Sequence, residues 1–501
     1  MKILSAAQMK AWDVFTIQSQ RISSWQLMER AATAVADAID NHRQLLDKNV
    51  FIFCGSGNNG GDGLAVGRIL FERGRNVHVV ISTPEIRTSA DFEINFEKIQ
   101  ALPIPITVFG VDEFPEIDFS NSFILDAIFG IGYNKPMPAA IEECISKINQ
   151  SACPIVSIDL PSGLFMSKST ALAVKANWVI TFQTPKLPLL FPQNHEFVQK
   201  ISIVDIGLER SFEITTPSLG VYITKDFIQS IYKPLQKYAH KGTQGHVCLI
   251  GGSFGKMGAV VLAAKAALKS GCGLVTAYIP KAGVTIMQTA VPEVMTLNDN
   301  EDTHISFINL PFIPSSIGIG IGLGVLGDTI NAFSDWLKNV KSPTVFDADA
   351  INILAQNQHF IRLLPSKSIL TPHPKELQRL IGAWSDDFVK IEKVKSFAKE
   401  YDLIVLVKGP HSIITDGTEV YFNSTGNPSM ATAGLGDTLT GVITSLLAQH
   451  YTPLQAAIFG VYIHGWAADL ATQDMGKESF TATDMWYYLG KVFKKLNELE
   501  F

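Results

Sequence analysis

Three glycines precede an acidic residue and an apolar helical run in the segment 426–441, GNPSMATAGLGDTLTG. Glycines that lead into a helix leave backbone N–H groups free to face an anion at the positive end of the helix dipole. Small side chains also let a phosphate group approach the backbone closely. Asp437 stands beside that position, where it could take a proton from an attacking hydroxyl. The pattern predicts phosphoryl-transfer chemistry, although a glycine-rich loop that only begins a helix has a similar sequence.

A second glycine-rich loop, GSGNNGGDG, covers residues 55–63 between a predicted strand and a predicted helix. Its opening matches GxGxxG, which is typical of dinucleotide-binding folds. An ordinary NAD site also needs an acidic residue at the tip of the next strand, but residues 81–83 read Ile-Ser-Thr. The sequence therefore argues against an NAD-dependent dehydrogenase. It predicts instead a phosphate-cradling loop that also carries the polar side chains of Asn59 and Asp62.

Polar residues follow other predicted strands of the first half, with Asp126 in LDAIFGIGYNKP and Asp159 and Ser162 in SIDLPSG. Ligands of open α/β sheets bind beyond the carboxyl ends of the strands, so we expect these residues to meet Asn59 there. Oxygen ligands without His or Cys suit a hard cation rather than zinc. The alternative is that each Asp caps a helix or a turn.

Strand ends in the second half carry a similar series: Gly322 in GIGLG, Asp347 and Asp349 in FDADA, His373 in LTPHPKE and Lys408 in LVKGPHS. The two acids are candidates for a Mg²⁺ or water site, and as an alternative at least one caps the following helix. A lone His such as His373 is structural about as often as catalytic. Lys408 with the following glycine is weak evidence for a phosphate contact.

The helix around His464, AAIFGVYIHGWAADLA, is apolar, so that histidine is expected to be packed in the core. The pattern of the whole chain alternates short apolar strands with helical runs, which predicts α/β units with mostly parallel sheets. Two helices are expected over residues 5–40, with Ser23 and Gln26 at capping-box spacing, and a hairpin is expected around Asp416-Gly417. The joint between two domains is expected near residues 210–220.

At 501 residues the chain is too long for one ordinary domain. It is 47% hydrophobic and 18% charged, which excludes a disordered chain. Its net charge of −6, without a basic block, argues against a nucleic-acid binder. Five scattered cysteines fit a reducing compartment. With neither a signal peptide nor an apolar run long enough to span a membrane, the expectation is a cytoplasmic protein without membrane or nucleic-acid partners.

The first 210 or so residues resemble the NAD(P)H-hydrate epimerase family. The matching segments are LSAAQMKAWD, GSGNNGGDGLAVGR, DAIFGIGYNKP, SIDLPSG and TFQTPK. The resemblance implies a Rossmann-like three-layer domain over residues 1–212 that interconverts the C6 epimers of hydrated NADH and NADPH, with Asp159 as acid or base. It implies potassium on Asn59, Asp126 and Ser162. It implies hydrate binding by Asn58, Asn59, Gly60, Gly61, Asp62, Gly130, Ile131, Gly132, Tyr133, Asn134, Lys135, Pro136 and Asp159.

One segment departs from this family. PSGL is usually followed by an acidic turn, whereas here the chain continues PSGLFMSKST and is shorter after Gly163. The departure concerns the shape of the loop more than Asp159 itself.

The second half resembles the ADP/ATP-dependent NAD(P)H-hydrate dehydratase family, through HKGTQGHVCLIGGS, GIGLG, DADAIN, LTPHPKEL, KGPHS and GNPSMATAGLGDTLTG. The resemblance implies a ribokinase-like domain over residues 218–501. It implies that Asp437 activates the C6 hydroxyl of the S hydrate toward the terminal phosphate of ADP or ATP, with Mg²⁺, after which phosphate leaves and NAD(P)H is restored. It implies hydrate on Ala259, Gly322, His373 and Asp437, and nucleotide on Lys408, Gly409, Pro410, His411, Ser412 and Gly436.

The two resemblances explain each other, because hydration gives both epimers and the dehydratase accepts one of them. Two alternatives remain open. One is a small-molecule kinase with a similar fold and a similar Asp437 loop. The other is a first domain that binds without catalysis. The sequence leaves the choice between ADP and ATP undecided, although the fused arrangement resembles prokaryotic members, which favours ADP. Family members commonly form homo-oligomers, so a homo-oligomer is expected.

Overall fold

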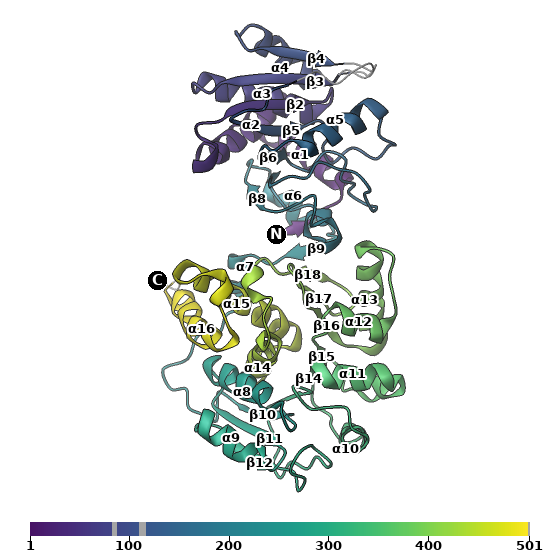
Figure 1. The fold of residues 1–501 in the computed structure, drawn as a ribbon, viewed down its shortest axis with the longest axis vertical. Coiled ribbons are helices and arrows are strands. Elements are labelled where there is room, and N and C mark those ends of the chain that lie inside the picture. Colours follow the sequence, from purple (N-terminus) through teal and green to yellow (C-terminus); the bar gives the residue numbers. More distant parts are fainter. Residues whose placement is uncertain (83–87, 110–116, 499–501) are drawn as a thin grey trace. The chain divides into compact units, whose positions relative to one another are not determined.

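A computed structural model describes residues 1–82, 88–109 and 117–498 (Figure 1). The chain divides into two compact units, Met1–Gly220 and Val221–Phe501. Each unit is built on one twisted sheet with helices on both faces, so the α/β class expected from the alternating pattern is confirmed. Among the helices that the structure describes, none combines the length and apolar composition needed to cross a membrane.

The sheet of the first unit is parallel throughout. In spatial order its strands are β4 (Ile106–Phe109), β3 (Val77–Ser82), β2 (Asn49–Cys54), β5 (Ser122–Ala127), β6 (Ile155–Ile158), β7 (Trp178–Phe182) and β8 (Ile201–Val204). The chain runs outward from β2 to β4, then returns to β5 and continues to β8. The strand order therefore switches between β2 and β5, which is where ligands of such sheets bind.

The first unit has three layers. Its helices are α1 (Ala6–Gln20), α2 (Ser24–Asp40), α3 (Asn58–Glu72), α4 (Ala90–Gln100), α5 (Ala139–Gln150) and the short α6 (Arg210–Thr215). Successive side chains of β2 point to opposite faces. Ile52 and Cys54 pack with α1 to α4, whereas Phe53 packs with α5. The predicted capping box at the start of α2 is present, with the side chains of Ser23 and Gln26 each bonded to the other's backbone N–H.

The sheet of the second unit is parallel except at β17, which runs antiparallel to both of its neighbours, β16 and β18. In spatial order its strands are β9 (Gly220–Tyr222), β18 (Val420–Phe422), β17 (Ile413–Thr415), β16 (Ile404–Val407), β15 (Ile369–Leu370), β14 (Thr344–Phe346), β13 (Ser316–Ile319), β10 (His246–Ile250), β11 (Leu274–Ile279) and β12 (Met295–Asn298). β17 and β18 form the predicted hairpin, and Gly417 in its turn has a φ of +89°.

Helices cover both faces of this second sheet (Figure 1). They are α7 (Lys225–Ile231), α8 (Met257–Lys269), α9 (Gly283–Ala290), α10 (Gly327–Leu337), α11 (Ala348–Gln356), α12 (Pro374–Ile381), α13 (Asp387–Tyr401), α14 (Leu435–Ala448), α15 (Pro453–Asp474) and α16 (Ala482–Asn497). Side chains of α14, α15 and α16 share one core with Val345, Ile369 and Leu406 of the sheet. Side chains of α10, α11 and α12 pack on the other face around Phe346.

Helices α8 and α14 lie unusually close together, because a glycine stands at their contact. A Cβ on Gly441 would lie 2.0 Å from the carbonyl oxygen of Ala263. Another glycine, Gly318 of β13, faces Thr444 of α14, where a Cβ would lie 2.6 Å from the Thr444 hydroxyl. Both glycines remove bulk where α14 meets its neighbours, so the helix packs closely on α8 and on β13.

Candidate active sites

Three predicted residues of the first unit follow neighbouring strands. Asn59 lies in the first turn of α3 after β2, Asp126 lies in β5, and Asp159 follows β6 directly. β2, β5 and β6 are adjacent in the sheet, so the structure brings the three residues to one edge, as their positions in the sequence predicted. This edge includes the switch point between β2 and β5.

Asp126 is the centre of an oxygen-rich cluster. Its buried carboxylate accepts hydrogen bonds from the Ser162 backbone N–H at 2.8 Å, the Ser157 hydroxyl at 2.7 Å and the Ser162 hydroxyl. Phe129 joins the cluster, because its N–H donates to Ser162 Oγ at 2.8 Å and its carbonyl accepts from Asn59 Nδ2 at 3.0 Å. Burial raises the pKa of Asp126, although these hydrogen bonds act in the opposite direction.

Asp159 is held by a buried ion pair. Its backbone has a φ of +63°, a left-handed conformation that is uncommon for a residue other than glycine. Lys186 Nζ contacts Asp159 Oδ1 and also donates to Thr181 Oγ1 at 3.0 Å and the Phe182 carbonyl at 2.8 Å. The Phe182 N–H donates to the same carboxylate oxygen at 3.1 Å. These contacts fix the Asp159 carboxylate against the end of β7.

Two further carboxyl groups share this electrostatic environment. The pKa of Asp13, on α1, is raised to about 7 by burial and by the negative charge of Asp159, with Lys186 acting in the opposite direction. The pKa of Asp62 is raised well above its usual range by burial and by the charges of Asp159, Asp13 and Asp91. Neighbouring carboxyl groups with raised pKa values are typical of sites that carry acid and base chemistry.

The roles of Asp13 and Lys186 were missed in the sequence, although both lie inside segments that resemble the epimerase family. A lysine soon after a buried strand, followed by an apolar stretch, is the signal that could have found Lys186. No comparable signal marks Asp13, because an acidic residue on an amphipathic helix is ordinarily at the surface.

The expectation of a loop over residues 55–63 is wrong in part, because α3 already begins at Asn58. Its first turn contains Asn58, Asn59, Gly60, Gly61 and Asp62. A Cβ on Gly60 would lie 1.8 Å from the Gly55 carbonyl oxygen, so the helix can start so close to β2 only with glycine at that position. At the next strand tip, Ile81 and Ser82 end β3, and Thr83 lies outside the described residues.

The predicted hydrate-binding loop 130–136 is packed against the segment that departs from the family. Tyr133 stacks on Phe129 with 3.9 Å between ring centroids and on Phe165 with 5.9 Å. Lys168 Nζ lies 4.0 Å from the centroid of the Phe165 ring. Tyr133 Oη is buried, and it has no hydrogen-bond partner among the described residues. Phe165 and Lys168 both belong to the altered stretch after Gly163, so that stretch supports the loop.

The second unit also brings its predicted residues together at the ends of adjacent strands, here β13, β14, β15 and β16. Their ends are followed by Gly322, Asp347, His373 and Lys408, so the predicted residues lie along one edge of the sheet. Gly322 has a φ of +61°, and a Cβ there would lie 3.2 Å from the Cβ of Ala259. The structure therefore places the two predicted hydrate-binding residues Ala259 and Gly322 side by side.

Asp347 is bound on both oxygens. Lys408 Nζ donates to Oδ1 at 2.8 Å, and the Thr440 hydroxyl of α14 donates to Oδ2 at 2.6 Å. A Cβ on Gly436 would lie 3.5 Å from Lys408 Nζ. Asp347 occupies the N-cap position of α11, but its side chain makes no capping hydrogen bond. Asp347 instead joins Lys408 to the first turns of α14.

Asp437 lies in the first turn of α14, not ahead of the helix, because the helix begins at Leu435 after a left-handed Gly434. Burial raises its pKa to about 6, helped by the charge of Asp347, while Lys408 acts in the opposite direction. The pKa of Lys408 is lowered by burial and raised more strongly by Asp347, by Glu376 and by Asp437. A cation and a carboxyl of high pKa thus stand together at the positive end of α14.

His373 has a structural task. It caps α12, with its Nδ1 accepting hydrogen bonds from the backbone N–H groups of Lys375 at 3.1 Å and Glu376 at 3.3 Å. Burial and the nearby charge of Lys408 lower its pKa. Asp349 accepts from the Gly324 N–H at 2.8 Å, which ties the loop after β13 to α11. His373 therefore has a structural role as the cap of α12, and its Nε2 lies 3.4 Å from Glu376 Oε1.

Residues 408–412 form the connection between β16 and β17. The Gly409 N–H donates to the Ser412 hydroxyl at 3.2 Å, and the same hydroxyl donates to the Gly409 carbonyl at 3.1 Å. His411 Nδ1 lies 3.1 Å from the carbonyl of Asn423, and burial lowers its pKa. His464 is buried within α15, as predicted, with Nε2 2.9 Å from the Thr438 hydroxyl.

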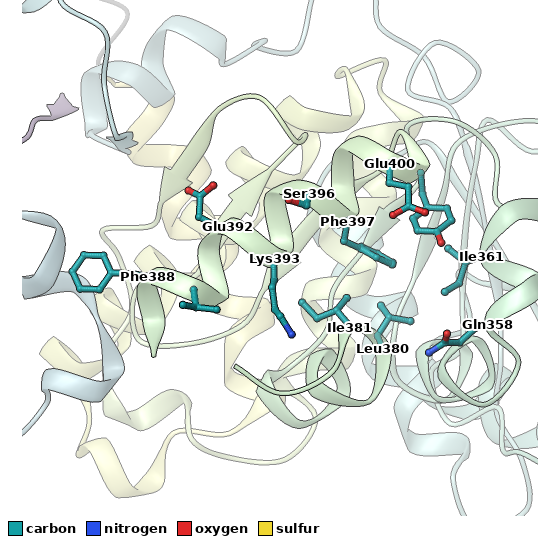
Figure 2. Close-up of a pocket in the computed structure, with 12 residues that line it drawn as sticks. Gln358, Ile361, Leu380, Ile381, Phe388, Glu392, Lys393, Ser396, Phe397 and Glu400 are labelled. Atoms are coloured by element: carbon teal, nitrogen blue, oxygen red, sulfur yellow. The ribbon is translucent and has the colours of Figure 1, made fainter. Parts of the chain in front are cut away.

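A cavity of about 550 Å³ lies elsewhere, between α12, α13 and the 3₁₀ turn Gln358–Leu363. Figure 2 shows Ile361, Leu380 and Phe397 gathered at its floor and charged Glu392 and Lys393 along α13. None of the residues singled out in the sequence lines this cavity.

In the described part of the chain, no group of three or more His, Cys, Asp or Glu side chains is placed to hold a metal ion. The Asp126 cluster differs from such a site, because it combines one carboxylate with hydroxyl and carbonyl oxygens and the amide group of Asn59.

Known protein families match both units. Residues 24–188 match the family model described as YjeF-related protein N-terminus, and residues 247–490 match the model described as NAD(P)H-hydrate dehydratase. Among solved structures, the ADP/ATP-dependent NAD(P)H-hydrate dehydratase of Bacillus subtilis, co-crystallised with ATP and Mg²⁺, is 26% identical with a TM-score of 0.48. The match covers 56% of this chain and 99% of that chain.

Full-length relatives give the same result. The bifunctional NAD(P)H-hydrate repair enzyme of Moorella thermoacetica is 34% identical, and the match covers 99% of this chain and 98% of the relative. The enzyme of the same name from Coxiella burnetii is 32% identical over 93% of this chain and 94% of the relative. The chain belongs to the family of bifunctional NAD(P)H-hydrate repair enzymes, which joins an epimerase and a dehydratase in one polypeptide.

Proposed function

We propose that residues 1–212 of this repair enzyme interconvert the R and S hydrates of NADH and NADPH at C6, and that residues 218–501 dehydrate the S form with ADP or ATP. The observation that carries the proposal is the position of Asp437. Its carboxyl stands in the first turn of α14, has a pKa of about 6, and shares the site with Lys408 and Gly436.

The dehydratase step follows from this geometry. Asp437 takes the proton of the C6 hydroxyl as that oxygen attacks the terminal phosphorus of the nucleotide. The bond from that phosphorus to its bridging oxygen breaks at the same time, so AMP leaves from ADP, or ADP leaves from ATP. Lys408 and the free N–H groups at the start of α14 stabilise the charge on the phosphate. The C6–O bond then breaks, phosphate leaves with the electron pair, and loss of a proton from C5 restores the ring double bond. We assign hydrate to Ala259, Gly322, His373 and Asp437, and nucleotide to Lys408, Gly409, Pro410, His411, Ser412 and Gly436.

For epimerisation we assign Asp159 as the acid or base at C6. Its carboxylate is fixed by Lys186, and the neighbouring carboxyls of Asp13 and Asp62 have raised pKa values that support proton movement near neutral pH. We assign hydrate binding to Asn58, Asn59, Gly60, Gly61, Asp62, Gly130, Ile131, Gly132, Tyr133, Asn134, Lys135, Pro136 and Asp159.

Potassium is assigned to Asn59, Asp126 and Ser162. The residues suit a hard monovalent cation, because the Asp126 carboxylate contacts the Ser162 hydroxyl, and Ser162 Oγ and Asn59 Nδ2 both reach the Phe129 carbonyl. The Asp126 carboxylate is wholly buried, and its hydrogen bonds in the described structure come from neutral groups. A bound cation would neutralise that charge and hold the loop 130–136 beside Asn59.

Several further assignments accompany the proposal. Mg²⁺ enters with the phosphates of ADP or ATP, since Asp347 is already bound by Lys408 and Thr440. We assign the chain to the cytoplasm, which its five free cysteines support. We also expect a homo-oligomer, which light scattering on the purified chain measures.

The test starts from a mixture of both NADH hydrate epimers with protein, K⁺, Mg²⁺ and either ADP or ATP, followed by the absorbance of the reduced nicotinamide. Recovery of nearly all NADH is expected. Recovery that stops when the S epimer is consumed would leave the dehydratase and remove the epimerase. A stable phosphorylated product without NADH would support a small-molecule kinase instead.

A further inference from the structure

Helix α15 holds the segment that carries Asp437 at several points. Figure 1 shows α15 beside α14 in the second unit, and the two helices share one core. Before the segment reaches α14, the Thr425 hydroxyl donates a hydrogen bond to the Tyr462 carbonyl of α15 at 2.7 Å. Gly465 of α15 has no side chain at this contact, where a Cβ would lie 2.5 Å from Thr425 Oγ1. The polar segment therefore lies directly on the α15 backbone.

Asp469 of α15 binds the beginning of the segment with both carboxylate oxygens. Oδ2 accepts from the Gly426 N–H at 2.9 Å, and Oδ1 accepts from Asn427 Nδ2 at 2.8 Å. Asn427 extends this hydrogen-bond network along the segment, because its Oδ1 accepts from the Ser429 N–H at 3.1 Å. Gly426 has a φ of +103°, a conformation that other residues rarely adopt. One carboxylate thus fixes a turn that the backbone alone would not hold.

His464 of α15 binds the other end of the segment. Its Nε2 lies 2.9 Å from the hydroxyl of Thr438, the residue after Asp437, and that hydroxyl donates to the Leu435 carbonyl at 2.9 Å. With the Thr438 proton so placed, the imidazole donates Nε2–H to Thr438 Oγ1. Burial lowers the pKa of His464 to about 3, so the ring stays neutral. His464 and Asp469 lie five positions apart on one helix and reach the two ends of the same loop.

We propose that Asp469 and His464 are positioning residues for nucleotide-dependent dehydration. Asp469 holds the turn at Gly426 and Asn427 so that the phosphate-binding segment is formed before the nucleotide arrives. His464 holds the first turn of α14, and with it Asp437, at its working position. The inference rests on the proposed function of the second unit, and it adds two residues that reach the reaction through other groups.

A shared carboxylate explains the choice of residue at position 469. A hydrogen bond from N–H to a carboxylate is about twice as strong as one between neutral groups. Asn at this position would keep the shape of the side chain, but its NH₂ group would face one of the two donors, the Gly426 N–H or Asn427 Nδ2. If α15 only filled the core, an apolar side chain would serve at both 464 and 469.

The first test is a double-mutant cycle on ADP binding, with Asp469→Asn, Asn427→Ala and the double variant. Each single variant is expected to weaken ADP binding about tenfold or more. The double variant should bind ADP no more weakly than the single variant with the larger loss. Thr472→Ala is the matched control, because the Thr472 hydroxyl donates within its own helix to the Asp469 carbonyl at 3.1 Å. Additive effects in the cycle, or equal loss in Thr472→Ala, would overturn the role of Asp469.

The second test separates binding from turnover. His464→Gln is expected to lower kcat for NADH recovery about tenfold while ADP affinity, measured by calorimetry, changes less than twofold. Equal losses of kcat and of ADP affinity, or a loss that follows the melting temperature across variants, would contradict positioning of Asp437. The proposed function is judged separately from the unmodified chain. If that chain binds ADP without dehydrating the hydrate, the proposed function fails while the binding cycle still tests Asp469.

Discussion

Lys408 Nζ lies 2.8 Å from Asp347 Oδ1 and so joins the ends of β16 and β14 across the intervening strand β15. The other oxygen of Asp347 accepts from Thr440, one helical turn after Gly436. The ion pair is therefore part of the support for α14, and it places one negative and one positive charge near Asp437. Burial raises the pKa of Asp437 most, and the two charges adjust it in opposite directions.

Replacing Asp437 by Asn tests the proposed general base. The amide keeps the size of the side chain but cannot accept the proton, so kcat for dehydration should fall about 10²- to 10⁴-fold. ADP binding by calorimetry and epimerisation by the first unit should stay nearly unchanged. A variant that keeps more than a tenth of the activity would remove Asp437 from the chemistry.

The pH dependence of dehydration reports the same carboxyl. A base with a pKa of about 6 is protonated and inactive below that pH. We expect kcat to be level above about pH 7 and to fall tenfold per pH unit below about pH 6. Stopped assays on buffered hydrate, with the stability of the hydrate checked in protein-free controls, measure this. A profile that stays flat down to pH 5 would contradict it.

The charge of Asp347 should shift the acidic limb of the pH profile, where kcat falls as the pH is lowered. Its negative charge raises the pKa of Asp437, so Asp347→Asn is expected to shift the acidic limb to lower pH. Lys408→Met removes a positive charge that lowers the same pKa and should shift the limb upward. Shifts in the same direction for both variants would show that the limb belongs to another group. Profiles taken at saturating nucleotide separate this effect from weaker binding.

Phe165 is expected to matter for epimerisation alone. Its ring supports Tyr133 in the predicted hydrate loop, and stacked pairs contribute about 0.5–1.5 kcal/mol. Phe165→Ala should lower kcat/KM of the epimerase about 3- to 10-fold, with dehydration of the pure S hydrate unchanged. Phe15→Ala is a control from the same unit, since Phe15 packs on Phe212, 5.6 Å away. Equal effects of the two changes would argue against a local role.

Potassium removal should separate the two activities. The proposed potassium site at the buried Asp126 predicts that epimerisation falls in potassium-free buffer and returns when K⁺ is added. Asp126→Asn should be slow at every K⁺ concentration, while the dehydratase is followed in parallel on pure S hydrate. An epimerase that is insensitive to K⁺, or an Asp126→Asn variant that still responds to it, would exclude the assigned site.

How much of the structure the sequence predicts depends on the kind of feature. Apolar periodicity predicted two α/β units. The spacing of Ser23 and Gln26 predicted the capping box, and the Asp416-Gly417 turn predicted the β17–β18 hairpin, because these features depend on neighbours in the chain. Motif resemblance predicted the family and placed polar residues at strand ends. The start of α3 was missed, since a run of Asn and Gly is typical of a loop and only the close approach of Gly60 to Gly55 lets it be helical.

The sequence by itself determined that Asp159 directly follows a predicted strand, that Asp437 follows a glycine-rich segment, and to which family such segments belong. The tertiary structure decided which partners surround them. Lys186 beside Asp159, Asp347 and Lys408 near Asp437, and Asp469 on the turn before α14 are separated by tens of residues or more from the groups they serve. Burial and charge from such distant residues set pKa values and loop positions, and the local spacing of residues in the sequence does not predict either of them.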